Sequence, residues 1–261
     1  MESSVKASVI IQARMGSSRL PGKVLMMLAD KTVLEHVVSR ARKAETIEEV
    51  VVATTEGKED DVIIQKTQSL GVNVYRGSEN DVLDRYFQAA KNFNLKDIVR
   101  ITADCPMMDP KLIDKVVTMY LKTKADYCSN TLTPTFPDGE DIEVFSFDAL
   151  SKAWEQAQLS SEREHVTPFL KKNKELFKIV SFEEKPNLAD KRWTLDEEAD
   201  YCFMKIIFKE LYPQNPFFGI EDILGFLKKN PQAETLNSRI IRDEGYKKSL
   251  AKDNHFKTIK Q

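Results

Sequence analysis

Short apolar runs alternate with stretches of helical periodicity along the first half of the chain, and this alternation limits the possible folds more than any other feature. The apolar runs are rich in β-branched residues and are about the length of a buried strand. They lie at residues 7–12, 49–54, 72–75 and 97–101, and the helical stretches at residues 32–44, 60–70, 79–91 and from Pro110 onward. Repeated strand and helix units predict an α/β fold with a doubly wound, mainly parallel sheet and right-handed crossovers.

The alternation stops beyond Asn130, where residues 131–139 are rich in turn formers. Regular alternation returns with a short strand at 192–195 and helices at 197–210 and 219–229. The polar, Lys-rich end of the chain is expected to be a solvated tail. The predicted organisation is an α/β core of residues 1–130 and 191–235, an inserted α+β lobe of residues 131–190, and a tail of residues 236–261.

Composition excludes several classes of partner. A net charge of −2 gives no global field for nucleic acid, and 41% hydrophobic residues supply an ample core. No apolar run approaches the roughly 20 residues that span a bilayer, and the first residues do not resemble a signal peptide. We therefore expect a cytoplasmic protein with no nucleic acid or membrane partner. The cysteines Cys105, Cys128 and Cys202 are far apart and are expected to be reduced and structural.

The loop after the first strand carries the clearest chemical signal. Open α/β sheets bind ligands at the carboxyl ends of their strands, and this loop combines two glycines, two serines and three cations with no acidic residue. Such a segment suits a triphosphate, although a basic solvated loop is the alternative. It matches neither the P-loop nor the dinucleotide fingerprint. The candidate nucleotide-binding residues are Ala13, Arg14, Gly16, Ser17, Ser18, Arg19 and Lys23.

The segment Gln12–Lys23 resembles the start of the cytidylyltransferase family that makes CMP-activated ulosonic acids, and is most similar to its spore coat polysaccharide biosynthesis protein F branch. Further branch motifs follow in the same order, at residues 77–86, 100–106, 139–144, 162–168 and 192–196. The resemblance covers roughly positions 8 to 225 and implies a nucleotide-binding sheet with a dimerising lobe, and therefore a homodimer. It also implies a cytidylyltransferase that uses CTP for surface polysaccharide or glycoconjugate synthesis.

Two aspartates are candidate metal ligands. Asp104 follows the strand that ends near Ile101, and Asp196 follows the strand expected at 192–195. Nucleotidyl transfer needs a divalent cation, normally Mg²⁺, which takes one or two protein carboxylates alongside water and substrate. The family places metal-binding aspartates at positions that resemble these two. The alternative for each is a helix or turn cap.

Residues outside the loop are candidates for binding the rest of the substrates. Ser78, in the second family motif, joins the nucleotide-binding set. A bidentate arginine suits the carboxylate or phosphate of an acceptor, but an i,i+4 pair of Arg85 with Asp81 is an equal alternative. Turn acids are often merely solvated, and a histidine is often a buried, hydrogen-bonded group. The acceptor-binding candidates are Arg85, Glu140, Glu143 and His165.

The predicted reaction is attack of an acceptor oxygen on the α-phosphorus of CTP, with a sugar acid or sugar phosphate as acceptor and pyrophosphate leaving. A metal-dependent glycosyltransferase that uses a nucleotide sugar is the alternative. It usually carries an Asp-x-Asp pair after a strand, whereas Ala103–Pro106 contains a single acid. A nucleotide-sensing module that has lost its chemistry is a third interpretation. Residue types alone do not distinguish CTP from other nucleoside triphosphates.

Overall fold

The computed structural model describes residues 6–240, 242 and 244–259, without the side chains of residue 252 and of residues 254–259. Its centre is a seven-stranded sheet in the order β5-β4-β1-β6-β8-β7-β9. Only β8 runs antiparallel to its neighbours within this sheet, which confirms the mainly parallel prediction. The strands are β1 (Ala7–Gln12), β4 (Ile47–Thr55), β5 (Asn73–Gly77), β6 (Asp97–Thr102), β7 (Tyr127–Ser129), β8 (Glu143–Ser146) and β9 (Ile179–Ser181).

Helices connect these strands and begin at local capping signals. Thr32 and Glu35 form a reciprocal capping box at the start of α1, and Pro110 occupies the first turn of α4. The helices are α1 (Val33–Lys43), α2 (Asp61–Ser69), α3 (Val82–Asn92), α4 (Pro110–Thr123), α5 (Phe147–Gln156), α6 (Ser160–His165), α7 (Pro168–Lys172), α8 (Glu198–Leu211), α9 (Ile220–Lys229), α10 (Pro231–Glu234) and α11 (Glu244–Ile259). Short elements fill the connections: the 3₁₀ helices η1 (Lys23–Leu25) and η2 (Lys58–Asp60), and the hairpin strands β2 (Met27–Leu28) and β3 (Lys31–Thr32).

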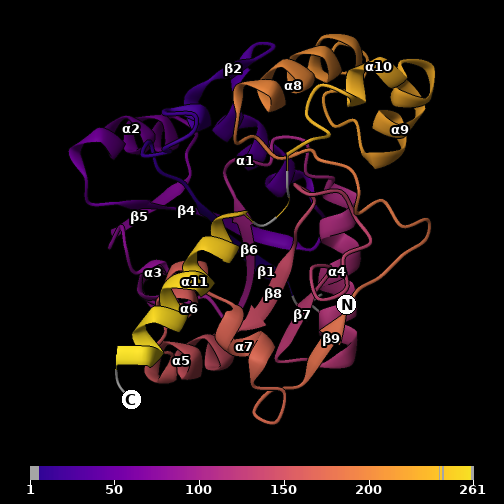
Figure 1. The fold of residues 1–261 in the computed structure, drawn as a ribbon. Coiled ribbons are helices and arrows are strands. Elements are labelled where there is room, and N and C mark those ends of the chain that lie inside the picture. Colours follow the sequence, from indigo (N-terminus) through magenta and orange to yellow (C-terminus); the bar gives the residue numbers. More distant parts are fainter. Residues whose placement is uncertain (1–5, 241, 243, 260–261) are drawn as a thin grey trace, which may run out of the picture.

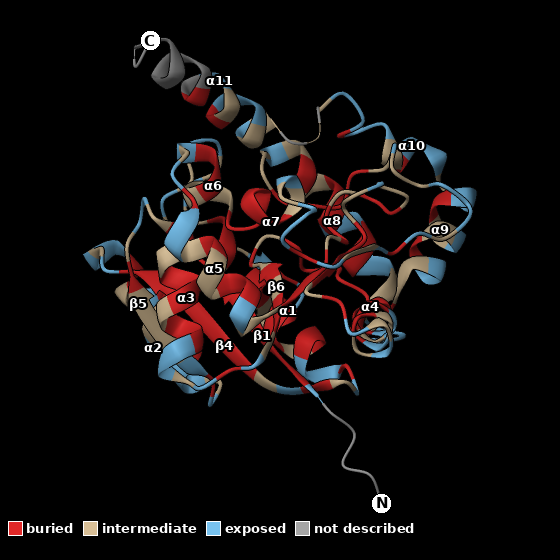
Figure 2. Ribbon diagram, turned by 90° about the horizontal axis from the view of Figure 1, so that it is seen from below, coloured by how far each residue is buried: buried red, intermediate tan, exposed pale blue. Residues whose placement is uncertain are grey.

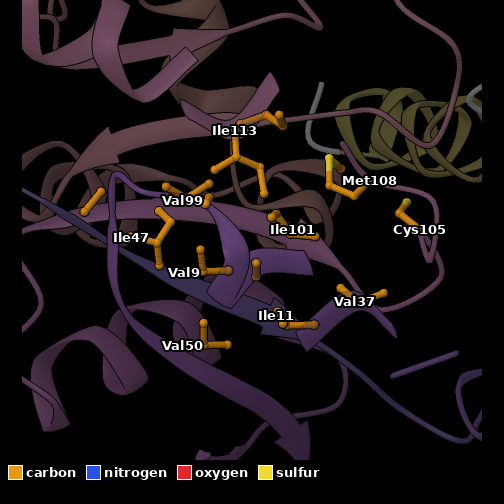
Figure 3. Packing of buried hydrophobic residues seen from close by; sticks show 14 of the residues in the cluster. Val9, Ile11, Val37, Ile47, Val50, Val99, Ile101, Cys105, Met108 and Ile113 are labelled. Carbon is orange, nitrogen blue, oxygen red and sulfur yellow. The ribbon is translucent and has the colours of Figure 1, made fainter. Parts of the chain in front are cut away.

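Both faces of the sheet are covered, as a doubly wound fold requires. Side chains alternate along a strand, so neighbouring residues of β1 enter different cores. Val9 and Ile11 pack with Val37 of α1 and Ile113 of α4 (Figure 3). Ile10 packs instead with residues of α3 and α5 on the opposite face. The burial pattern in Figure 2 agrees, because the strands and inward helix faces are buried while outward faces are exposed.

The part expected as an inserted lobe shares the central sheet, because β8 lies between β6 and β7, and β9 forms the edge. Its helices α5 and α7 contribute to the core on one sheet face. The strand expected at 192–195 does not form, and the segment makes an isolated bridge between Asp138 and Arg192. Beyond it, α8, α9 and α10 gather at one end of the molecule (Figure 1). They pack around their own apolar core, which includes Trp193 and Phe203.

The end of the chain differs from the solvated tail that was expected. The long helix α11 packs across α6 (Figure 1). Ser249 and Asp253 on α11 are buried. No described helix has the length and apolar character needed to cross a bilayer. The three cysteines are free, and Cys105 and Cys128 are buried, as expected for structural thiols.

Candidate active site

A cleft of about 680 Å³ opens at the carboxyl edge of the parallel strands. The loop after β1 and residues Thr102–Asp104 after β6 form its floor, because β1 and β6 are neighbours in the sheet. The first turn of α3 and Asp196 add further walls. One side of α6 and the first turns of α11 complete the boundary. The cleft therefore lies at the edge where open α/β sheets bind their ligands.

Backbone hydrogen bonds hold the loop after β1 in a closed shape. The carbonyl of Met15 accepts from the amides of Ser17 and Gly22 at 2.9 and 3.0 Å, and Gly22 has a φ of 72°, which favours glycine. The Met15 amide donates to the buried carboxylate of Asp60 at 2.7 Å. Asp60, which the sequence did not single out, therefore anchors the loop. All the predicted residues of this loop line the cleft: Ala13, Arg14, Gly16, Ser17, Ser18, Arg19 and Lys23.

Lys23 joins the two predicted metal ligands. Its Nζ lies 2.6 Å from Asp104 Oδ2 and 2.8 Å from Asp196 Oδ1. The amide of Leu195 donates to the Asp104 carbonyl at 2.9 Å, which brings the two acidic segments together. Burial opposes the charge on Lys23, but the carboxylates of Asp104 and Asp196 outweigh it and raise the lysine pKa. Burial likewise opposes the charge on Asp104, yet Lys23 lowers the Asp104 pKa to about 2.

Arginines complete the charge network around Asp196. Its carboxylate lies 3.0 Å from both Arg19 and Arg192. Arg192 also pairs with the fully buried Asp200 at 2.9 Å. Burial works against the Arg192 charge, but Asp200 and the other nearby acids raise its pKa. Asp196 therefore lies within a network of cations that also includes Lys23.

The donor set at Asp104 and Asp196 fits a magnesium ion. Magnesium prefers hard oxygen ligands and usually binds through one or two carboxylates, with water and substrate oxygens completing its shell. Two carboxylates already share one cationic group here, the Lys23 ammonium. Within the described part of the chain, no group of three or more His, Cys, Asp or Glu could form an all-protein cage. The arrangement suits a metal held jointly with a phosphate.

Arg85 lines the cleft but does not pair with Asp81. Its guanidinium donates to the Ser78 carbonyl at 2.7 Å, and its Nε has no partner. Asp81 instead caps α3 and pairs with Arg163. Arg85 is only 2% exposed, and burial lowers its pKa. The cleft therefore contains a buried arginine that makes no ion pair with any residue in the described ranges.

Three predicted residues do not line the cleft. The Ser78 hydroxyl accepts from the Asp81 amide at 3.0 Å, in the turn before α3. Glu140 is fully buried, where its carboxylate accepts from the Asp109 amide and burial raises its pKa. Glu143 was expected to bind the acceptor, but its side chain is buried and pairs with Arg100 at 2.6 Å. Neither glutamate is placed to contact an acceptor in the cleft.

His165 does line the cleft, at the end of α6. Its Nε2 lies 3.0 Å from the hydroxyl of Ser249 on α11, and its ring makes an edge contact with Tyr246. The next residue, Val166, has a φ of 70°, and the Thr167 amide donates to the His165 carbonyl at 2.8 Å. This tight turn ends α6 and holds the histidine at the cleft wall.

Several cleft residues escaped the sequence analysis. Glu79 and Asn80 lie between the Ser78 and Arg85 positions that were singled out. Helix α11 contributes a larger set, which was part of the expected tail. The only sequence signal for that set is its helical spacing, which is common in polar helices. The missed residues on or against α11 are Glu164, Glu244, Gly245, Lys248 and Ser249.

Comparison with known proteins agrees with this geometry. The pattern of the cytidylyltransferase family matches residues 8–235. The spore coat polysaccharide biosynthesis protein SpsF of Bacillus subtilis is 31% identical over 232 residues, which are 87% of this chain and 95% of that protein. The 3-deoxy-manno-octulosonate cytidylyltransferase of Solibacter usitatus is 34% identical over 135 residues, 51% of this chain and 52% of that enzyme.

A solved structure shows the same fold. A cytidylyltransferase from Leptospira borgpetersenii serovar Hardjo-bovis is 36% identical and superposes with a TM-score of 0.84. The superposition covers 91% of this chain and all of that one. The family match includes the loop after β1, Asp104 and Asp196, and it ends before α11 begins at Glu244.

Proposed function

The chain belongs to the cytidylyltransferase family, and from this premise we propose that it couples CTP to a sugar acid or sugar phosphate with release of pyrophosphate. The observation that supports this best is the cluster of Lys23, Asp104 and Asp196 in the cleft. The relatives named for spore coat polysaccharide and 3-deoxy-manno-octulosonate support a role in surface polysaccharide or glycoconjugate synthesis.

The loop after β1 would bind the triphosphate. Its backbone amides and the cations Arg14, Arg19 and Lys23 surround one end of the cleft. In the reaction, a bond forms between an acceptor oxygen and the α-phosphorus of CTP, and the bond from that phosphorus to the pyrophosphate oxygen breaks. Negative charge develops on the leaving pyrophosphate, and fixed cations stabilise it. These cations now contact protein carboxylates, so nucleotide binding exchanges one set of anions for another.

Asp104 and Asp196 would hold Mg²⁺, which when bound neutralises phosphate charge and helps to orient the reacting groups. Lys23 then serves as a counter-charge for the same two carboxylates and for the phosphates. The depressed pKa of Asp104 keeps it ionised and ready to bind a cation over the physiological pH range.

The acceptor would occupy the part of the cleft beside Arg85 and His165. A guanidinium that is buried without a carboxylate partner is suited to a carboxylate or phosphate, because it can bind either one through two hydrogen bonds. His165 also lines the cleft and offers a ring nitrogen. Of the predicted acceptor-binding residues, these two remain candidates.

A screen of the four nucleoside triphosphates against a panel of acceptors tests the proposal. The panel contains sugar acids, including 3-deoxy-manno-octulosonate, and sugar 1-phosphates, and pyrophosphate is measured in the presence of Mg²⁺. The expected result is pyrophosphate release that requires both CTP and a sugar acid or sugar phosphate. Release of nucleoside diphosphate from a nucleotide sugar would instead identify a glycosyltransferase. Tight CTP binding without turnover across the panel would indicate a sensing module.

The homodimer and the cytoplasmic location expected from the sequence remain predictions. Sedimentation of the purified chain tests the first, and fractionation of cells that express it tests the second.

A further inference from the structure

Asp200 is a fully buried carboxylate in the first turn of α8, four residues after the candidate metal ligand Asp196. Its Oδ2 accepts hydrogen bonds from the backbone amides of Asp196 and Glu197, at 2.9 and 3.0 Å. The bond from Glu197 is the ordinary capping contact at the start of a helix. The bond from Asp196 goes further, because it fixes the backbone of the candidate metal ligand itself.

Arg192 connects the same carboxylate to the side chain of Asp196. Its Nε and Nη2 donate to Asp200 Oδ1 and Oδ2 at 2.9 and 3.0 Å, which is the bidentate pairing of a guanidinium with a carboxylate. Nη2 also donates to Asp196 Oδ2 at 3.0 Å. Asp200 therefore holds the Asp196 backbone directly and the Asp196 side chain through Arg192.

The two oxygens of the Asp196 carboxylate consequently have different surroundings. Oδ2 contacts the guanidinium groups of Arg192 and Arg19, both at 3.0 Å. Arg192 is buried, so it cannot move away from Oδ2 without breaking its ion pair with Asp200. Oδ1 lies instead on the side of Asp104, because both carboxylates contact the Nζ of Lys23. Asp196 therefore offers one oxygen, rather than two, to a cation beside Asp104.

Asn237 completes this network from the segment after α10. Its side-chain amide donates to Asp200 Oδ1 at 2.9 Å and to the Arg192 carbonyl at 3.0 Å, and the side chain is buried. This residue lies beyond positions 8–235, which match the family pattern. A buried carboxylate whose accepting positions are filled by such bonds is held in a single orientation.

The ion that is proposed to bind at Asp104 and Asp196 requires such a fixed ligand. Mg²⁺ demands near-ideal octahedral geometry, whereas Ca²⁺ accepts more oxygens in a flexible shell and binds carboxylates through one oxygen or two. A carboxylate that is held with one oxygen toward the site therefore suits Mg²⁺ better than Ca²⁺. Removal of a group that orients a metal ligand typically lowers metal affinity about 10- to 100-fold.

We propose that Asp200 is a positioning residue, which holds Asp196 with a single oxygen on the side of Asp104, and that Asn237 keeps Asp200 in place. This inference rests on the proposed function and identifies the groups that make its metal site prefer Mg²⁺ over Ca²⁺. If Asp200 served only as the cap of α8, its loss would lower the free energy of unfolding and leave the preference between the two cations unchanged.

The test is the affinity of the full chain for α,β-methylene CTP, which cannot release pyrophosphate, measured by calorimetry with excess Mg²⁺, with excess Ca²⁺ and with EDTA. The ratio of the affinity with a cation to the affinity with EDTA is the gain due to that cation. We expect Asp200→Asn to reduce the Mg²⁺ gain about tenfold, the Ca²⁺ gain less than about threefold, and the affinity in EDTA less than about twofold.

Asp222→Asn is the matched control, and Asn237→Ala is a second test variant. Asp222 makes the same capping contact at the start of α9, to the Gly219 amide at 2.9 Å, and does not line the cleft. Asn237→Ala removes one donor to Asp200 without changing the charge, so we expect the Mg²⁺ gain to fall about threefold. Circular dichroism checks that each variant is folded, and Asn237→Ala decides the test if Asp200→Asn does not fold.

An unchanged Mg²⁺ gain in either folded variant would overturn the inference, as would equal losses of the Mg²⁺ and Ca²⁺ gains. An effect of Asp222→Asn equal to that of Asp200→Asn would also overturn it. In these cases a wild type that binds the analogue more tightly with Mg²⁺ still supports the proposed function. A wild type that binds no analogue in any of the three buffers contradicts the proposed function, and the inference fails with it.

Discussion

Two clusters of carboxylates and cations in this molecule differ in how far their side chains are exposed to solvent. At the cleft, Asp104 and Asp196 share Lys23, and their side chains are 23% and 21% exposed. In the second cluster, Glu143 of β8 pairs with Arg100 of the neighbouring strand β6 at 2.6 Å and with Lys171 at 2.7 Å. The Glu143 side chain is 3% exposed. The first cluster is open to ligands, whereas the second is closed.

The difference lies in how completely each carboxylate is satisfied by the protein. Besides its two cations, Glu143 accepts hydroxyl hydrogen bonds from Tyr127 and Thr167, both at 2.7 Å. A carboxylate with all of its accepting positions used inside the protein cannot take a ligand without losing contacts. In the proposed function, Asp104 and Asp196 exchange Lys23 for a metal or a phosphate-bound cation. By that proposal, the same types of residue bind substrate at one site and support the fold at the other.

The largest expected effect is the loss of activity when the open cluster is changed. Replacing Asp104 by Asn removes the charge proposed to bind the metal, so we expect turnover to fall by about 1,000-fold or more while the chain still folds. Pyrophosphate release and circular dichroism measure the two properties. Asp97→Asn, at the other end of β6, is the control and should keep most of the activity. Nearly normal pyrophosphate release from Asp104→Asn would rule out this role for the open cluster.

A substitution in the closed cluster should lower the stability of the fold rather than the turnover. Glu143→Gln leaves Arg100 and Lys171 without their counter-charge, so we expect the free energy of unfolding to fall by about 3 kcal/mol. Urea denaturation measures this loss, and kcat at a temperature where the variant is folded should stay within about threefold of the wild type. A variant of normal stability whose turnover collapses would place Glu143 in the active site and remove the distinction between the clusters.

The closed cluster should also make the free energy of unfolding depend on pH in the acid range. Burial opposes the Glu143 charge, but Lys171 and Arg100 outweigh it and hold the Glu143 pKa well below its usual value. Because the folded-state pKa is depressed, this stabilisation is complete above the unfolded pKa and is lost as pH falls below about 4.5. Between pH 5 and 3, the wild type should lose about 2 kcal/mol more stability than Glu143→Gln. Parallel curves of unfolding free energy against pH for the two proteins would contradict this account.

The smallest expected effect concerns the arginine that has no counter-charge. Arg100 is paired in the closed cluster, whereas Arg85 is buried at the cleft without an acidic partner among the described residues. Arg85→Met should therefore raise the KM for the acceptor about tenfold and leave the free energy of unfolding within about 1 kcal/mol of the wild type. Steady-state kinetics and urea denaturation measure both quantities. A loss of stability with an unchanged KM would make Arg85 a structural residue.

Local signals explain how much of the fold could be predicted. The first turns of α1 and α4 follow from Thr32 and Pro110, because N-terminal capping depends on residues within one turn. A strand depends on a distant partner, and the run at 192–195 makes an isolated bridge to Asp138 and one backbone hydrogen bond to Asp104 instead of a ladder. Which side chains of β8 are buried also depends on the elements that pack against this strand. Strand alternation puts Glu143 and Val144 on opposite faces, but it does not show that Lys171 of α7 pairs with Glu143.

The sequence by itself determined the α/β alternation, the cationic loop after the first strand, and the presence of an aspartate after β6. These features depend on neighbouring residues and on the rule that ligands bind at the carboxyl edge of a parallel sheet. The tertiary structure decided which distant groups meet. Lys23 reaches Asp104 across 81 residues and Asp196 across 173 because β1 lies beside β6 and the Leu195 backbone bonds to Asp104. It also decided that α11 lines the cleft, since the polar contacts that seat this helix are made to residues of α6 that lie 84 to 92 positions away.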